Sequence, residues 1–507
     1  LLDILAQDYD VALMNPPYGA SGRMPKQVRE YVKEHYSYTQ EYYVNFFEVC
    51  NSLSKEFGRV GMIVQRSFMY KSSFTEFRED LIGEVGAFDF LAEYGNDVLD
   101  KATVRTAGSV IRSGAIGSDE QTGVFYRLHD LEAGEKESGF LQAAFDDLPS
   151  GSIPREYRRK LSEFKHIPES PLSYWVPEEL RKIYTADSVF DAGNAGVERD
   201  SVGDVKVGLQ TGNDDRFTRR FWETTTDFWV PFAKGGEDAW FIPSVDRCLA
   251  WGENGEEIER YSGSYPRNRS FYFSEALTYT YMKSSGRRFG YLHPSSVFGH
   301  AGNVFVPKDN TWQALSYANS HLMTYLMLCQ TPERHWEVGN VSKVPWNENL
   351  ETRDELEALP KEVIGSLIDK RQHDFTSPHY QRPALLSVLD TEESFQIYDH
   401  PHRNLRDDLA QTDLAFPATP SDSLEYLGVE TARRLEQINA DLQSYASEMD
   451  EAVFDCFDIS DSQREIVFQE IALRTNADPR KQEEYDPDSI TEPSENFSEQ
   501  VKDLLLH

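Results

Sequence analysis

The chain has 507 residues, enough for two to four domains with cores of their own. Its 86 acidic and 51 basic residues give a formal net charge of −35 at pH 7. No apolar run approaches the ~20 residues that cross a bilayer, so we expect no membrane-spanning helix and no membrane partner. The four cysteines stand far apart, which excludes a disulfide framework or a zinc-ligand spacing and favours a reducing cytoplasm.

The acidic balance bears on possible partners, because DNA affinity comes largely from Lys and Arg that neutralise phosphates. One interpretation is that the protein does not bind DNA. Another is that it works in a very salty cytoplasm, where acidic surfaces stay hydrated and charge repulsion is screened over about 3 Å at 1 M salt. The acidic residues are spread along the whole chain and Arg outnumbers Lys, which favours the halophilic interpretation.

The first informative stretch is an apolar run, residues 11–14, that is followed by Asn15-Pro16-Pro17-Tyr18. The run predicts a short buried strand. Proline has no N–H for a sheet ladder and fixes φ, so we expect the strand to end in a stiff loop.

That loop carries the groups needed to hold a planar base with an exocyclic amine. The side-chain oxygen of Asn15 and the carbonyl of Pro16 can each accept one N–H of the amine. Tyr18 can stack on the ring, a contact worth roughly 1–3 kcal/mol per base. The structural alternative is an ordinary turn after a strand, because Asn and Pro are common turn formers.

The Asn-Pro-Pro-Tyr sequence resembles the motif of N6-adenine DNA methyltransferases, which transfer the methyl group of S-adenosyl-L-methionine. The resemblance implies that Asn15, Pro16, Pro17 and Tyr18 are the catalytic residues. It also implies that double-stranded DNA is the partner.

After the motif, the periodicity predicts alternating helices and strands. We expect helices at 41–53 and 72–82 and strands at 59–64, 87–91, 109–111 and 123–128, with Gly58 as the cap of the first helix. This alternation predicts a doubly wound α/β sheet with its ligand at the carboxyl ends of the strands. By resemblance, it is the C-terminal half of a class I methyltransferase sheet.

In this resemblance, Phe46 matches a position that packs against the cofactor's adenine in TaqI-like enzymes, although a helical aromatic is as readily a core residue. The family binds S-adenosyl-L-methionine with a Gly-rich loop that precedes the motif. Only fourteen residues precede Asn15, and none of them forms such a loop. We therefore expect a truncated chain, whose missing half lies upstream or in a separate polypeptide.

Residues 196–350 resemble the target-recognition domain of type IIG, Eco57I-like restriction-modification methylases, and more closely that of the PglX-type methyltransferases of BREX phage defence. The resemblance rests on residues 207–217, 229–236, 267–273 and 317–320. Here glycines allow sharp turns and cationic side chains offer donors to DNA. The DNA-binding residues we expect are Gly208, Thr211, Asn213, Lys234, Arg267 and Arg269, with further donors at Arg287 and Arg288.

These patterns predict five regions. Residues 1–130 form a partial catalytic domain, 131–195 a connector, 196–350 the recognition domain, 351–474 a helical region and 475–507 an acidic, disordered tail. Asp458 or Ser460 is expected to cap the last helix.

Two other functions remain open. Related loops that begin with Gly or Ser methylate glutamine or cytosine, but the aromatic end of this motif and the recognition domain argue against that chemistry. The other is a recognition subunit without catalysis of its own, which follows from the missing cofactor loop and needs other defence-system subunits.

The halophilic interpretation predicts that stability requires molar salt, because a charge of −35 repels itself at low ionic strength. We expect the thermal unfolding temperature to rise steeply between 0.1 and about 3 M KCl, where the Debye length falls to a few ångströms. An unfolding temperature that does not change over this range would refute the interpretation.

Overall fold

The computed structural model describes twelve stretches of the chain: residues 7–17, 19–83, 86–99, 104–114, 121–145, 153–224, 227–235, 240–283, 288–332, 335–374, 377–380 and 424–475. The chain divides into two compact units. The first comprises residues 1–185 with 329–332, and the second comprises residues 186–328 with 333–507. The domain boundaries expected at 130, 195 and 350 stay predictions.

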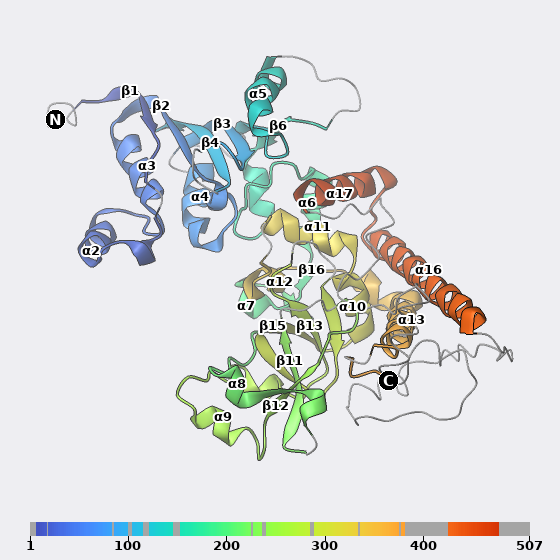
Figure 1. Cartoon of the computed structure of the whole chain (residues 1–507). Helices are drawn as coiled ribbons and strands as arrows, with labels where there is room; N and C mark the ends of the chain where they lie inside the picture. Colours follow the sequence, from blue (N-terminus) through green and yellow to red (C-terminus); the bar gives the residue numbers. More distant parts are fainter. Residues whose placement is uncertain are drawn as a thin grey trace. The chain divides into compact units, whose positions relative to one another are not determined.

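The first unit is built on a six-stranded sheet. Its elements are β1 (Tyr9–Met14), α2 (Lys26–His35), α3 (Tyr42–Ser52), β2 (Ser54–Gln65), α4 (Thr75–Gly83), β3 (Gly86–Gly95), β4 (Thr106–Ser113), β5 (Thr122–Arg127), α5 (Lys136–Phe145), β6 (Glu156–Lys160) and α6 (Glu178–Arg181). The strand order is β1-β2-β4-β3-β5-β6 (Figure 1). Strands β1, β2, β3 and β5 run parallel to one another, whereas β4 and β6 are antiparallel to their neighbours.

The α/β class and the predicted elements of this unit are confirmed. Helix α3 buries Tyr43, Val44 and Phe47, and its apolar spacing fits a helix packed on a sheet. The prediction of Gly58 as a helix cap is wrong, because α3 ends at Ser52 and Gly58 lies inside β2. A Cβ at Gly58 would stand 3.2 Å from the carbonyl oxygen of Asp10, so the glycine permits close pairing of β2 with β1.

Strand β1 lies at one end of this sheet and pairs with no described strand other than β2. Successive side chains of a strand point to opposite faces. On one face Val11 is 54% exposed and Leu13 is 78% exposed, while on the other Met14 lies against Cys50 of α3. One face of β1 is therefore an uncovered apolar surface.

The second unit has a seven-stranded sheet and a small three-stranded one. Its strands are β7 (Ser188–Val189), β8 (Asp200–Ser201), β9 (Gly203–Lys206), β10 (Thr218–Arg220), β11 (Trp229–Gly235), β12 (Arg247–Ala250), β13 (Ala276–Thr280), β14 (Phe289–Leu292), β15 (Val297–Pro307) and β16 (Pro345–Trp346). The larger sheet has the order β10-β12-β11-β15-β13-β14, with β9 also paired to β15, and the smaller has the order β16-β7-β8. Phe232, Leu249 and Phe298 are among the buried residues of its core.

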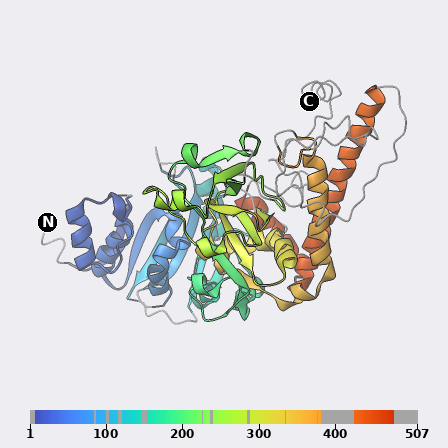
Figure 2. The ribbon, with the colours of Figure 1, turned by 90° about the horizontal axis from the view of Figure 1, so that it is seen from below.

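Helices complete this unit. They are α7 (Ala192–Ala195), α8 (Asp214–Phe217), α9 (Glu256–Arg260), α10 (Thr311–Ala318), α11 (His321–Gln330), α12 (Val338–Ser342), α13 (Asp354–Arg371), α16 (Leu424–Cys456) and α17 (Asp461–Arg474). The long helix α16 runs beside α13 (Figures 1 and 2). The predicted helices after residue 424 are confirmed, and Ser460 is the N-cap of α17. In the described part of the chain, no helix is long and apolar enough to cross a membrane.

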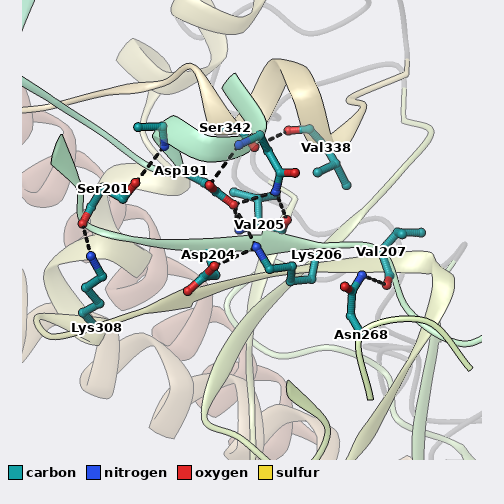
Figure 3. Close-up of polar contacts among 12 residues, drawn as sticks. Asp191, Ser201, Asp204, Val205, Lys206, Val207, Asn268, Lys308, Val338 and Ser342 are labelled. Carbon is teal, nitrogen blue, oxygen red and sulfur yellow. Dashed lines mark hydrogen bonds and ion pairs between the residues drawn. The ribbon is translucent and has the colours of Figure 1, made fainter. Parts of the chain in front are cut away.

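A buried polar network holds β9 to the start of this unit (Figure 3). The Asp191 carboxylate accepts hydrogen bonds from the backbone N–H of Asn194 at 3.1 Å and of Val205 at 2.9 Å. Lys206 Nζ lies 3.0 Å from Asp191 Oδ2 and 2.7 Å from Asp204 Oδ1. Burial alone would raise the pKa of Asp191, but these backbone donors and Lys206 together bring the pKa below its usual value.

We expect Asp191→Asn to lower the free energy of unfolding by about 1–3 kcal/mol at pH 7, because it leaves the partly buried Lys206 ammonium group without one of its two carboxylates. A lowered folded-state pKa stabilises the fold above the unfolded value of about 3.9, and this contribution is lost as pH falls through the folded value. The difference in the free energy of unfolding between wild type and Asp191→Asn, measured by urea unfolding, should therefore narrow from pH 5 to pH 3. Asp187 is exposed, so the control variant Asp187→Asn should have the same free energy of unfolding as wild type.

Candidate functional site

The loop after β1 presents two hydrogen-bond acceptors at the carboxyl end of the strand. Asn15 is exposed and Pro16 is buried. Neither the side-chain oxygen of Asn15 nor the carbonyl of Pro16 accepts a hydrogen bond from a described residue. Pro17 is exposed, and Tyr18 lies outside the described residues. Two adjacent acceptors are thus available to a ligand with a pair of N–H donors.

The far end of the loop is tied to the segment before α3. Ala20 and Glu41 form an antiparallel bridge, and the Ser21 N–H donates to the carbonyl of Gln40 at 2.9 Å. The Tyr42 N–H donates to the carbonyl of Gly19 at 3.3 Å. A Cβ at Gly19 would stand 3.0 Å from the Tyr42 ring, so a glycine there lets the loop lie against that ring.

The Glu41 side chain adds a second tie to the same loop. Burial raises the pKa of this half-buried carboxyl, and the raise is partly offset by the backbone N–H of Gly19, which donates to it, and by the charges of Lys71 and Arg23. The backbone N–H of Gly19 is therefore held by a carboxylate. Glu41 was not singled out in the sequence, where it stands only as the polar start of a helix.

A buried ionic group lies at the carboxyl ends of β2 and β3. Arg66 directly follows β2 and donates to Glu93 of β3, and both side chains are almost fully buried. The Tyr174 hydroxyl donates to the other Glu93 oxygen at 2.7 Å. Sequence reasoning missed Arg66 and Glu93. The available signal was a charged residue at the end of each of two apolar strands.

Phe46, the expected contact of the cofactor, lies on α3 with 42% of its surface exposed. Its neighbours Val44, Asn45 and Phe47 are buried. An exposed phenyl ring on a helix that packs against β1 is available to a ligand, and it is not needed to fill the core of the described residues.

The glycines expected at the DNA-binding loops serve close backbone contacts. A Cβ at Gly208 would stand 2.2 Å from the carbonyl oxygen of Phe298. Gly212 has a φ of +71°, and a Cβ there would stand 2.1 Å from the carbonyl oxygen of Gly263. Side chains other than hydrogen would disrupt both contacts.

The polar side chains expected in the same loops have partners within the protein. Thr211 is buried and its hydroxyl donates to Asp214. Asn213 is the N-cap of α8, and its side-chain oxygen accepts the N–H of Arg216 at 3.0 Å. Their intramolecular bonds shape the loop.

The cationic side chains differ from one another. Lys234 Nζ pairs with Asp214 at 2.6 Å, and Arg269 pairs with Glu259 at 2.6 Å. Arg267 is exposed and forms no ion pair with a described residue. The expectation of a DNA-facing donor at Arg288 is wrong, because its guanidinium is buried 3.9 Å over the Trp336 ring. Arg287 lies outside the described residues.

Comparison with known proteins agrees with the motif. Residues 3–89 match the family model described as Eco57I restriction-modification methylase. This segment holds β1, the Asn-Pro-Pro loop, α3 and β2. The first part of the chain is therefore similar to Eco57I-type restriction-modification methylases.

Two curated relatives are more specific. The chain is 24% identical over 431 residues to the adenine-specific methyltransferase PglX of Lacticaseibacillus casei (strain Zhang), which covers 79% of this chain and 33% of the relative. It is 26% identical over 381 residues to the adenine-specific methyltransferase BrxX of Escherichia coli O9:H4 (strain HS), which covers 71% of this chain and 29% of the relative. The chain thus spans about a third of the relatives' length. The resemblances read from the sequence are confirmed.

A search of solved structures also finds the type IIL restriction-modification enzyme MmeI in complex with DNA. The TM-score is 0.45 at 11% sequence identity, over 92% of this chain and 57% of that one.

We expect Glu41→Ala to loosen the motif loop without unfolding the first unit, because it removes one acceptor and leaves the backbone bridge. One lost hydrogen bond of about 1 kcal/mol should speed amide hydrogen exchange at Gly19 several-fold, up to about ten-fold. Glu30→Ala on the exposed face of α2 is the matched control and should leave the amide exchange rate at Gly19 unchanged. An unaltered exchange rate at Gly19 in Glu41→Ala would contradict the hydrogen bond between the Gly19 N–H and the Glu41 carboxylate.

Proposed function

We propose that the chain is the base-binding and DNA-recognition part of a site-specific adenine-N6 DNA methyltransferase of a restriction-modification or BREX defence system. The observation that carries this proposal is the pair of acceptors on Asn15 and Pro16, at the carboxyl end of β1, that have no partner among the described residues. They lie within the segment that matches the Eco57I methylase family.

The chemistry follows from the acceptors. The target adenine leaves the duplex at a cost of a few kcal/mol and reaches the loop after β1. Asn15 Oδ1 and the Pro16 carbonyl each accept one N–H of its amine, which keeps the nitrogen lone pair available for attack. Pro17 stiffens the loop, and Tyr18 stacks on the ring. Two acceptors select an amine over a carbonyl at that position of the base.

S-adenosyl-L-methionine, when bound, supplies the activated methyl group. Phe46 would pack against its adenine, and the exposure of the phenyl ring fits that role. The chain's own sequence offers no Gly-rich loop for the rest of the cofactor. We propose that the edge of β1 that has no described partner receives the strand that precedes this loop, and that the uncovered face with Val11 and Leu13 receives the helix that follows it. These elements belong to a preceding segment or to a separate methyltransferase half.

Residues 196–350 would find the target site and residues 351–474 would support them, so that recognition and methyl transfer use different parts of the chain. The second candidate is a DNA-recognition subunit without catalysis of its own. The exposed Leu13 favours it, because β1 lacks a covering layer among the described residues.

We place the protein in a salt-rich cytoplasm. The charge of −35 and the absence of a membrane-spanning helix among the described residues support this placement.

We expect Asn15→Ala to lower methyl incorporation into target DNA by about 10²–10³-fold, the usual loss when one preorganised polar group at a reacting centre is removed. Specific DNA binding should change little, because in this proposal Asn15 contacts only the flipped base. Both quantities are measured in the same high-salt buffer, with Asn51→Ala as an amide control at the far end of α3.

The assay is run on this chain alone and together with a cofactor-binding methyltransferase half. Near-normal methylation by Asn15→Ala would make the motif a structural turn and would refute the proposal. Specific DNA binding with neither methylation nor S-adenosyl-L-methionine binding under both conditions would establish the recognition subunit instead.

A further inference from the structure

Two loops of the second unit are joined through their backbones. The Gln210 N–H donates to the Tyr265 carbonyl at 3.2 Å, and the Tyr265 N–H donates back to the Gln210 carbonyl at 2.8 Å. On the other side, the N–H of Leu209 donates to the Phe298 carbonyl and the N–H of His300 donates to the Leu209 carbonyl, both at 2.9 Å. Residues 209–210 thus lie between two other extended segments.

The register fixes which side chains share a face. Leu209 is the parallel partner of Gly299, so Gln210 and His300, one residue further on each segment, lie on the same face. Gln210 is the antiparallel partner of Tyr265, which places Tyr265 on that face too. Leu209 points to the opposite face and is buried. His300, Gln210 and Tyr265 therefore form a row, which we call the polar row.

All three side chains of the polar row are exposed, and 53% of Tyr265 is accessible. The exposed Arg267 follows Tyr265 by two residues, after a turn in which its N–H donates to the Tyr265 carbonyl at 2.9 Å. Neither Gln210 nor Arg267 has a side-chain hydrogen bond or ion pair with another described residue. In a chain with 86 acidic residues, these four positions hold no carboxylate.

Three acidic side chains of α8 and α9 pair with cations within the protein. Asp214 is paired with Lys234, and burial alone would raise its pKa, but Lys234 and Thr211 bring the pKa below its usual value. Glu257 is paired with Arg216, and Glu259 with Arg269. Arg267 therefore remains the cation beside the row that forms no internal pair among the described residues.

The support beneath the row is rigid. Asn268 Nδ2 donates to the Val207 carbonyl at 2.9 Å, which ties the two loops together a second time (Figure 3). The preceding residue, Lys206, belongs to the buried Asp191 network. The close contacts at Gly208 and Gly212 leave the backbone little room to shift.

We infer that the polar row, with Arg267, reads base edges of duplex DNA in the major groove. This inference rests on the proposed function and assigns the side chains that would give it sequence specificity. A Gln side chain pairs with adenine N6 and N7, an Arg side chain with guanine O6 and N7, and an aromatic ring contacts the thymine methyl group. Arg269 and Lys234 would act on the backbone at most, because their charges are already paired.

The dimensions fit the groove. Neighbouring strands lie about 4.8 Å apart, so the three segments of the row span roughly 10 Å. Successive base pairs rise by about 3.4 Å, so the row covers about three of them. The major groove is about 12 Å wide and admits a two-stranded β-ribbon, whereas the minor groove is about 6 Å wide.

The test is selection of binding sites from a randomised duplex DNA library by the full 507-residue chain in high salt, followed by sequencing. We expect wild type to enrich a motif that contains adenine and guanine positions. Gln210→Ala should reduce discrimination at one adenine by about ten-fold, and Arg267→Ala should do so at one guanine. Gln210→Glu should shift the preference at its position toward cytosine, whose N4 amine donates to a carboxylate.

Gln437→Ala and Arg433→Ala on α16 are the matched controls, since both residues are exposed and remote from the row in sequence. Unchanged motifs in the three row variants would overturn the inference and leave the proposed function standing. Equal weakening for all sequences would also overturn it, because it would show phosphate contacts. If wild type selects no motif, site-specific recognition fails, and the inference fails with it. The methyl-incorporation assay with Asn15→Ala tests the catalytic proposal separately.

Discussion

Proline lacks a backbone N–H, and this constraint governs the end of β1. With Pro16 and Pro17 after Asn15, the chain cannot continue its ladder with β2, and the strand ends with its acceptors unpaired. Elsewhere in a folded protein, a carbonyl at a strand end normally finds a donor. Among the described residues these groups have no donor, and Asn15 is exposed, while Glu41 and Gln40 hold the other end of the loop.

In the second unit, the loop around residues 209–210 differs from the motif loop, because its backbone groups are paired within the protein. Residues 209–210 have backbone partners on both sides, and Gly208 and Gly212 allow close contacts beside them. The first arrangement leaves polar groups available to a ligand. The second pairs the backbone groups of residues 209–210 within the protein, so that their side chains are left to contact a ligand. The proposed function would use both arrangements, one to hold a base and one to read a DNA site.

Features fixed by local periodicity could be predicted from the sequence, including α3, the strands that follow it, and the Ser460 cap of α17. The Asn-Pro-Pro loop could also be predicted, because proline acts within two residues of itself. Contacts between distant segments could not. Gly58 contacts β1, Arg66 pairs with Glu93, and Lys234 pairs with Asp214, and a single sequence does not reveal such partners. The prediction that Arg288 is a donor to DNA was wrong for the same reason, since its partner Trp336 lies far along the chain.

The separation of backbone and side chains in the polar row has an evolutionary consequence. The hydrogen bonds that hold residues 209–210 use only main-chain atoms, and any residue except proline can make them. Exposed side chains without internal partners can be exchanged at little cost in stability. New combinations at positions 210, 265, 267 and 300 can therefore arise on one unchanged scaffold. Under the proposed function, such a surface would let the DNA sequence that the protein reads change while the fold stays the same.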